Sequence, residues 1–227
     1  MIPLRDVIPS RTKPVVTVTL ITLNVLVYVF QALLSDRAEE MFIYSFGLIP
    51  AQFSLVTMFT AMFVHAGLAH LVGNMLFLWI FGDNVEDRMG HVRFVIFYGI
   101  CGAAAAFAQV AINPGATVPM VGASGAVAGV MGAYLVLYPH SRVLMLFPFP
   151  VFLFELPAIV FLGFWFLMQF LNGIDQLPVF QHNQISGGVA FWAHVMGFIA
   201  GLVLIVFMKR PERTRVDWWD TVEDHRR

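Results

Sequence analysis

The side chains best suited to chemistry in this sequence are one serine, two histidines and one asparagine, all set in long apolar stretches. Ser124 lies in the run Val-Gly-Ala-Ser-Gly-Ala-Val, among small residues. His70 and Asn74 are four residues apart, so a helix would present both on one face. His194 lies in a further apolar stretch. A serine hydroxyl next to a histidine base is the arrangement of nucleophilic catalysis, and an asparagine amide can stabilise an oxyanion.

Each of these side chains also has an ordinary structural explanation. A serine at the start of a membrane helix usually caps the helix or packs, and a histidine or asparagine within a span often only bonds a neighbouring helix. The combination is more informative, because polar groups in lipid are costly and all four fall at a similar predicted depth. A zinc site is disfavoured, since His65 and His70 are five residues apart rather than four and no acidic residue lies at that depth.

Composition places the chain in a membrane. Hydrophobic residues make up 59% and charged residues 12% of the 227 residues, with a mean hydropathy of +0.79, whereas about a quarter of the residues in soluble domains are charged. The net charge of −1 provides no basic surface for nucleic acid. The single cysteine, Cys101, excludes an intrachain disulfide. We expect a lipid bilayer as the surroundings, and neither a metal nor another cofactor.

The apolar stretches predict an all-α polytopic membrane protein, a bundle of six transmembrane helices with no second domain. We divide the chain into an N-terminal segment, a six-helix domain and a charged tail, which cover residues 1–14, 15–208 and 209–227. The predicted spans are residues 15–34, 68–81, 94–111, 124–138, 148–172 and 189–208, and residues 41–66 are predicted to form an interfacial element. Polar turns are predicted at residues 83–88 and 139–147, and a polar connection at residues 173–188.

Small residues predict which helices approach closely. Glycines recur at spacings of three and four in the fourth and sixth predicted spans: Gly125, Gly129, Gly132, Gly197 and Gly201. Such faces let helix backbones come together in a membrane. The fourth and sixth spans should therefore bring Ser124 and His194 within hydrogen-bonding distance.

The distribution of positive charge predicts the orientation. Twelve of the thirteen Lys and Arg residues lie in the two termini and in the turns at 83–93 and 139–147, and only Arg37 lies in the other set of loops. Because positively charged loops stay in the cytoplasm, both termini are predicted to be cytoplasmic. Ser124 would then lie near the outer end of its span.

The motifs together resemble those of the rhomboid family of intramembrane serine proteases, in its six-span bacterial form, over about residues 57–201. They are the run from His65 through His70 to Asn74, the run Gly122-Ala-Ser124-Gly125, and His194 followed by Gly197 and Gly201. The resemblance implies that Ser124 is the nucleophile and His194 its general base. It also implies that His70, Asn74 and the Ser124 amide form the oxyanion hole, with Gly122 shaping the adjoining loop.

The function implied by the resemblance is cleavage of the transmembrane segments of other membrane proteins through a Ser-His dyad, in a prokaryotic cell membrane. A non-catalytic rhomboid-like protein that binds membrane clients is the alternative, but such a protein would be expected to lack Ser124 or His194. A small-solute transporter would be expected to show paired charges or inverted repeats, and the sequence has neither.

The sequence departs from the family pattern at two places. Many relatives have a Trp-Arg pair in the first outer loop, where this chain has Val56-Thr57. Some relatives have an aromatic residue four positions after the nucleophile, where this chain has Ala128. The anchoring of the loop and the orientation of the His194 ring are therefore open. With no acidic residue placed to orient that ring, backbone or packing contacts are predicted to do so.

Overall fold

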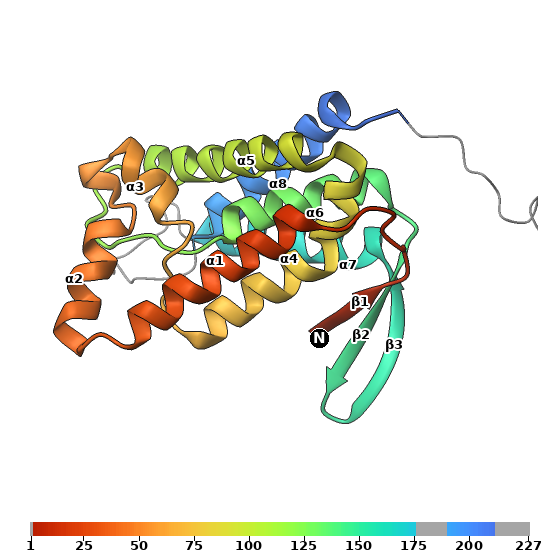
Figure 1. Ribbon diagram of the computed structural model, residues 1–227, viewed down its shortest axis with the longest axis horizontal. Helices are drawn as coiled ribbons and strands as arrows, with labels where there is room; N and C mark the ends of the chain where they lie inside the picture. Colours follow the sequence, from red (N-terminus) through yellow and green to blue (C-terminus); the bar gives the residue numbers. More distant parts are fainter. Residues whose placement is uncertain (1, 176–189, 212–227) are drawn as a thin grey trace, which may run out of the picture.

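The computed structural model describes residues 2–175 and 190–211 as a helical bundle with a small sheet at one end (Figure 1). The helices of the bundle are α1 (Val15–Ala32), α4 (Leu68–Met89), α5 (His91–Ile112), α6 (Ser124–Leu137), α7 (Ala158–Asp175) and α8 (Phe191–Met208). Shorter helices follow α1: α2 (Asp36–Phe46), η1 (Pro50–Gln52) and α3 (Leu55–Thr60). The strands are β1 (Ile2–Asp6), β2 (Arg142–Pro148) and β3 (Val151–Pro157).

Four of the described helices, α1, α4, α5 and α8, are long and apolar enough to cross a membrane. The apolar segments in α6 and α7, Ser124–Leu137 and Ala158–Ile174, are shorter than these four. At 1.5 Å per residue the 14 residues of α6 extend only about 21 Å, less than the ~30 Å of a hydrocarbon core. The predicted beginning of this helix at Ser124 and its end before Pro139 are confirmed.

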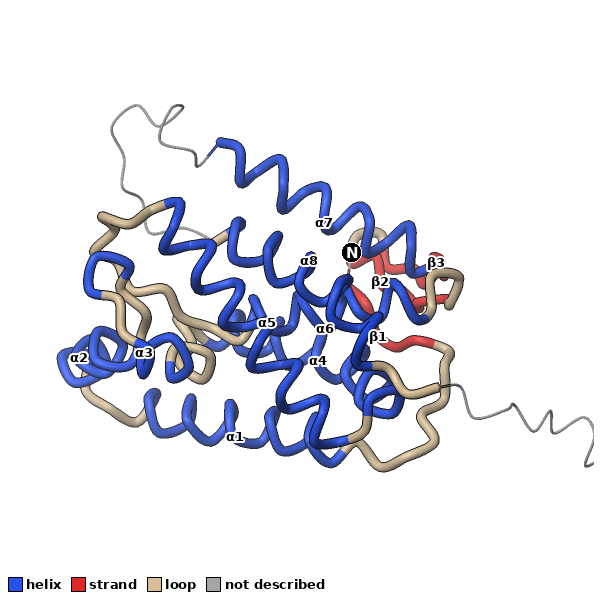
Figure 2. The backbone as a smooth tube through the Cα atoms, turned by 90° about the horizontal axis from the view of Figure 1, so that it is seen from above, coloured by secondary structure: helices blue, strands red, loops and turns tan. Residues whose placement is uncertain are grey.

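Helix α6 is the centre of the bundle. It contacts α4, α5, α7 and α8, and its residues from Gly125 to Tyr134 are all buried. Helices α1 and α7 lie on opposite sides of this centre (Figure 2). A helix enclosed in this way is apolar all round, and α6 has no charged residue.

Helix α1 reverses the usual pattern, since its buried residues are polar. They are Thr17, Asn24 and Gln31, seven residues apart and fully buried. The Glu86 carboxylate accepts hydrogen bonds from the Val16 and Thr17 amides at 2.9 and 2.8 Å and from the Thr17 hydroxyl at 2.7 Å. The first amides of a helix have no partner within it. A buried carboxylate on α4 therefore caps α1 and fixes the two helices against each other.

This contact corrects the predicted turn at residues 83–88, which instead form the last turns of α4. The run of polar residues there is the pattern that predicts a turn. They remain helical because their side chains have partners: Glu86 caps α1, and Asp87 accepts hydrogen bonds from the amide and hydroxyl of Thr12 at 3.0 and 2.6 Å.

The all-α prediction is wrong for the sheet. Strand β2 pairs antiparallel with β3, from Arg142 opposite Pro157 to Pro148 opposite Val151, and β1 pairs antiparallel with β2. The sequence predicts a turn at residues 139–147 and a span at residues 148–172, because the apolar run has no visible break. Burial alternates along β2, where Val143 and Met145 are buried and their neighbours are not, which is the period of a strand.

Two predicted segments lie largely outside the described residues. The polar connection at 173–188 falls there beyond Asp175, where α7 ends, and the charged tail at 209–227 falls there beyond residue 211. The interfacial element at 41–66 corresponds to most of α2 and to η1 and α3.

Replacing Glu86 with Gln should destabilise the bundle by about 2–4 kcal/mol, because an amide leaves buried N–H donors facing a further donor. Thermal or denaturant unfolding in detergent measures the loss. Glu155→Gln is the matched control, since Glu155 pairs with Arg142 at 3.2 Å on the surface and such pairs contribute ~1 kcal/mol or less. Equal effects of the two changes would contradict the capping role.

Asp6 should make stability depend on pH. Burial raises its pKa to about 6 from 3.8, opposed by a hydrogen bond from the Tyr134 hydroxyl and reinforced by the charge of Asp83. Between these values the folded protein binds a proton that the unfolded chain does not, so stability should rise as pH falls from about 6 towards 4. Asp6→Asn should flatten this part of a melting-temperature profile. An unchanged slope in the variant would assign the dependence to other groups.

Candidate active site

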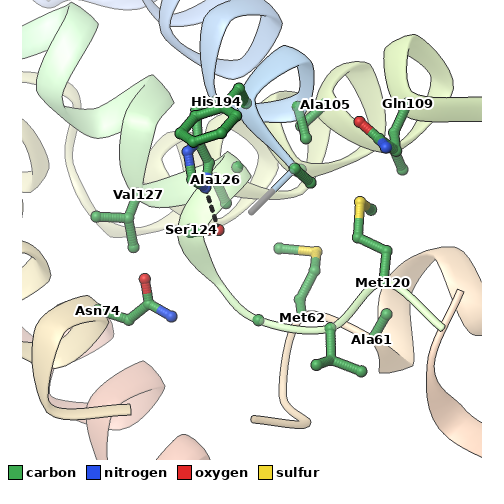
Figure 3. Close-up of a pocket in the computed structure, with 18 of the residues that line it drawn as sticks. Ala61, Met62, Asn74, Ala105, Gln109, Met120, Ser124, Ala126, Val127 and His194 are labelled. Atoms are coloured by element: carbon green, nitrogen blue, oxygen red, sulfur yellow. Dashed lines mark hydrogen bonds between the residues drawn. The ribbon is translucent and has the colours of Figure 1, made fainter. Parts of the chain in front are cut away.

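The predicted nucleophile and base meet between α6 and α8. Ser124 is the first residue of α6 and His194 is in the first turn of α8. The distance from Ser124 Oγ to His194 Nε2 is 2.7 Å (Figure 3). His194 is buried, with 9% of its surface exposed. The hydroxyl can donate to a neutral imidazole in this geometry, which is the ground state required for general-base activation.

Facing glycines bring the two helices together, as the spacing predicted. A Cβ atom built on Gly197 would collide with the Gly125 carbonyl oxygen, and one on Gly201 with the Gly129 carbonyl oxygen. Helix α5 also approaches α6 closely, because a Cβ on Gly129 would lie 2.5 Å from the Cys101 side chain. Only glycine allows this spacing between backbones, and the spacing places Ser124 next to His194.

The other nitrogen of His194 contacts a residue that no motif in the sequence predicts. The Gln169 side-chain oxygen, Oε1, lies 2.8 Å from His194 Nδ1. Because an amide oxygen only accepts, Nδ1 carries the proton and Nε2 is left free to accept from Ser124. A side-chain amide on α7 therefore supplies the contact that was predicted to come from backbone or packing. A glutamine in an apolar span was the available signal.

An aromatic ring also contacts His194, but it comes from α7 and not from the position four residues after Ser124. Trp165 lies one helical turn before Gln169 on α7, and its ring centroid is 5.9 Å from that of His194 at an interplanar angle of 37°. Ala128 is fully buried within α6. The pair on α7 holds the ring from one side by packing and at Nδ1 by a hydrogen bond.

The predicted oxyanion residues lie across the same space. Asn74 is 7% exposed and points into the cavity (Figure 3). Its Nδ2 is buried and has no hydrogen-bond partner among the described residues. An unpaired buried donor is costly, so this amide is available to a bound oxygen. Asn74 and His70 are one turn apart on α4, as predicted.

Gly122 shapes the loop between these groups and Ser124. Its φ is +115°, a left-handed conformation that favours glycine. A Cβ on it would lie 2.7 Å from His70 Nε2 and 3.4 Å from Asn74 Nδ2. Its amide donates to the Ala61 carbonyl at 2.8 Å, which ties this loop to the end of α3. Any larger residue here would occupy the space beside the predicted oxyanion donors.

These groups line one cavity of about 1470 Å³. Ser124, His194, His70, Asn74 and Gly122 all contribute to its wall. Trp165 and Gln169 line it from α7, and Gln109 and Asn113 add polar groups at the end of α5. A cavity of this size with several polar groups can hold water, which hydrolysis within a membrane requires.

The loop that precedes α4 is anchored by a glutamine rather than by a Trp-Arg pair. Gln31, fully buried at the end of α1, donates to the His65 carbonyl at 2.7 Å and accepts from the His65 amide at 3.3 Å. The His65 ring is buried, and burial lowers its pKa to about 4. It does not belong to the cavity wall. His65 therefore belongs to the anchored part of the loop, whereas His70 belongs to the cavity wall.

Comparison with known proteins shows the family of this chain. The family model described as the Rhomboid domain matches residues 52–211. The chain belongs to the rhomboid family. All of the site residues named above except Gln31 lie within the matched region of the rhomboid domain.

Three curated relatives show the range of the similarity. RHOMBOID-like protein 6, mitochondrial, of Arabidopsis thaliana is 34% identical over 152 residues, 65% of this chain and 43% of that protein. Rhomboid protease GluP of Bacillus subtilis is 30% identical over 138 residues, 59% of this chain and 27% of that protein. Putative rhomboid protease YdcA of the same organism is 27% identical over 164 residues, 68% of each chain. The rhomboid chain thus spans less than half the length of the first two relatives.

Gly197→Ala should separate α6 from α8, because its methyl group would meet the Gly125 backbone. We expect a loss of stability of about 1–3 kcal/mol from overpacking. Gly163→Ala in α7 is the matched control, since a Cβ there has no neighbour within 4 Å and alanine favours a helix over glycine. Thermal unfolding in detergent compares the two. A neutral Gly197→Ala variant would contradict the close approach.

Proposed function

We propose that this rhomboid protein is an intramembrane serine endopeptidase that hydrolyses peptide bonds in the transmembrane segments of other membrane proteins. The observation that carries the proposal is the 2.7 Å hydrogen bond from Ser124 to His194 in a cavity that Asn74 also lines. Membership of a family that includes Rhomboid protease GluP supports it.

In the proposed reaction, Ser124 Oγ attacks the carbonyl carbon of the scissile bond while His194 Nε2 accepts the hydroxyl proton. The same nitrogen then gives that proton to the departing amine, and an acyl-enzyme ester remains on Ser124. Water from the cavity attacks the ester with His194 again as base, and the acid product leaves.

Gln169 has a positioning role in this scheme. Its Oε1 accepts the Nδ1 proton of His194, so the ring keeps the tautomer and orientation that the reaction needs. A neutral amide cannot stabilise the imidazolium as a carboxylate would. The proposed unit is therefore a Ser-His dyad held in place by an amide.

The oxyanion of the tetrahedral intermediate is proposed to bind Asn74 Nδ2, His70 and the Ser124 amide. The first amides of α6 have no acceptor within their own helix, and the unpaired Asn74 donor can bind the negative charge as it develops. Each preorganised donor of this kind is worth about 3–4 kcal/mol in related chemistry.

In the proposed membrane placement, α6 and α7 complete a six-span bundle, the domain of residues 15–208, with both termini in the cytoplasm of a prokaryotic cell. The excess of Lys and Arg in the termini supports that orientation. Since α6 begins at Ser124 and is short, the reactive hydroxyl would lie below the outer surface of the membrane. Substrate helices must unwind there, so small or helix-breaking residues near the cut are expected.

Cleavage of a purified transmembrane substrate by the reconstituted protein tests the proposal. Ser124→Ala and His194→Ala should each reduce fragment formation by roughly 10³-fold or more, and the double variant should be no worse than either one. Ser45→Ala is the control, because the Ser45 hydroxyl only bonds the Met41 carbonyl within α2. Fragments that persist in folded Ser124→Ala, or a wild type without activity on any such substrate, would contradict a protease.

Gln169→Leu should lower kcat by roughly fivefold with little change in KM, because one neutral hydrogen bond to His194 contributes about 1 kcal/mol. Gln169→Glu keeps an acceptor at the same place and should retain most of the activity. A purely structural role predicts a loss of stability in the Leu variant with kcat unchanged in the folded fraction, so unfolding is measured alongside kinetics.

A further inference from the structure

The hairpin of β2 and β3 is apolar beyond what its fold requires. Residues 143–154 contain no charged side chain. Val143 and Met145 on β2 face the bundle and are fully buried. Towards the tip, however, Phe149 is 90% exposed and Val151 77% exposed, with Leu153 and Phe152 exposed next to them. In water this hairpin would present a contiguous apolar surface without a partner.

Charge on the hairpin is confined to its base. Glu155 lies opposite Leu144, two positions from Arg142 in the strand register, and the Arg142 and Glu155 side chains pair at 3.2 Å. No charge follows until the chain has passed through the tip and returned. This change from a charged base to an apolar tip is expected of a segment whose base is in water and whose tip is in an apolar environment.

The hairpin is continuous with a surface that faces lipid. It lies at the end of α6 opposite Ser124, and β3 leads directly into α7 at Ala158. Helix α7 exposes Ile159, Val160 and Phe164 on its outer side. The strands run across the direction of α5 (Figure 1), which suits a hairpin that extends along a membrane surface rather than through it.

The edge of the sheet limits how deep the hairpin can lie. The strand order is β1-β2-β3, so β3 is an edge with unpaired backbone groups. Such groups are not tolerated in hydrocarbon but are solvated at the level of the headgroups. The backbone must therefore stay in the interfacial layer, and only side chains near the tip can reach the acyl chains.

From these observations we propose that the β2–β3 hairpin is an interfacial anchor, whose tip at Phe149 and Val151 inserts into the lipid surface beside α7. The ligand is the bilayer itself. The proposal uses the placement of α7 as a span and is independent of catalysis, so it can be tested in the Ser124→Ala variant.

Site-directed spin labelling tests the depth of the tip. Phe149→Cys and, with Phe149 intact, Val151→Cys would carry a nitroxide in lipid nanodiscs that hold one copy of the protein. Cys101 is fully buried, and the unsubstituted protein measures its background. His140→Cys marks the aqueous side, since His140 is exposed, and Phe164→Cys marks the outer surface of α7.

Collisions with oxygen and with a water-soluble nickel chelate give the depth of each label. The depth of the labels at 149 and 151 should lie between the depths of the labels at 140 and 164. Phe149→Asp should shift the depth of the label at 151 towards that of the aqueous label at 140. Tip labels as accessible to nickel as position 140 would overturn the anchor. Shielding found only when several copies share a membrane would overturn it too, because the tip would then bind a second copy.

Discussion

The close contact of α6 with α8 is the constraint on which the rest of the structure depends. Facing glycines allow the Gly125 and Gly129 carbonyls to approach the backbone of α8, and the Ser124–His194 hydrogen bond of 2.7 Å exists because they do. A larger side chain at Gly197 would separate α6 from α8 and would therefore also separate Ser124 from His194. Close packing of small residues is also how helices associate in lipid, where water provides no hydrophobic driving force between them.

The second physical theme is the satisfaction of polar groups in apolar surroundings. Glu86 caps α1, Gln31 holds the His65 backbone and Gln169 holds His194. Each is buried or half-buried and has a hydrogen-bond partner, as a low-dielectric interior demands. Asn74 differs, because its Nδ2 has no partner among the described residues and lies at the cavity. An unpaired donor at the wall of the cavity supports a role in binding a developing charge.

The sequence predicted those parts of the structure that depend on local pattern. Glycine spacing predicted the approach of α6 and α8, and the four-residue spacing of His70 and Asn74 placed them on one face of α4. Contacts between distant segments were not predicted. The cap that Glu86 provides to α1 and the hydrogen bond between Gln169 and His194 join residues far apart in the sequence, and no local pattern indicates either one. The sheet was missed because an apolar strand and the start of an apolar helix look alike over a few residues.

Covalent trapping of the nucleophile tests the central claim most directly. The wild-type protein in lipid would be treated with a fluorophosphonate, and the adduct mapped by mass spectrometry. We predict a single stoichiometric adduct on Ser124, with labelling slowed greatly in His194→Ala and modestly in Gln169→Leu. No adduct, an adduct on another serine, or labelling of His194→Ala at the wild-type rate would contradict a hydroxyl activated by that histidine.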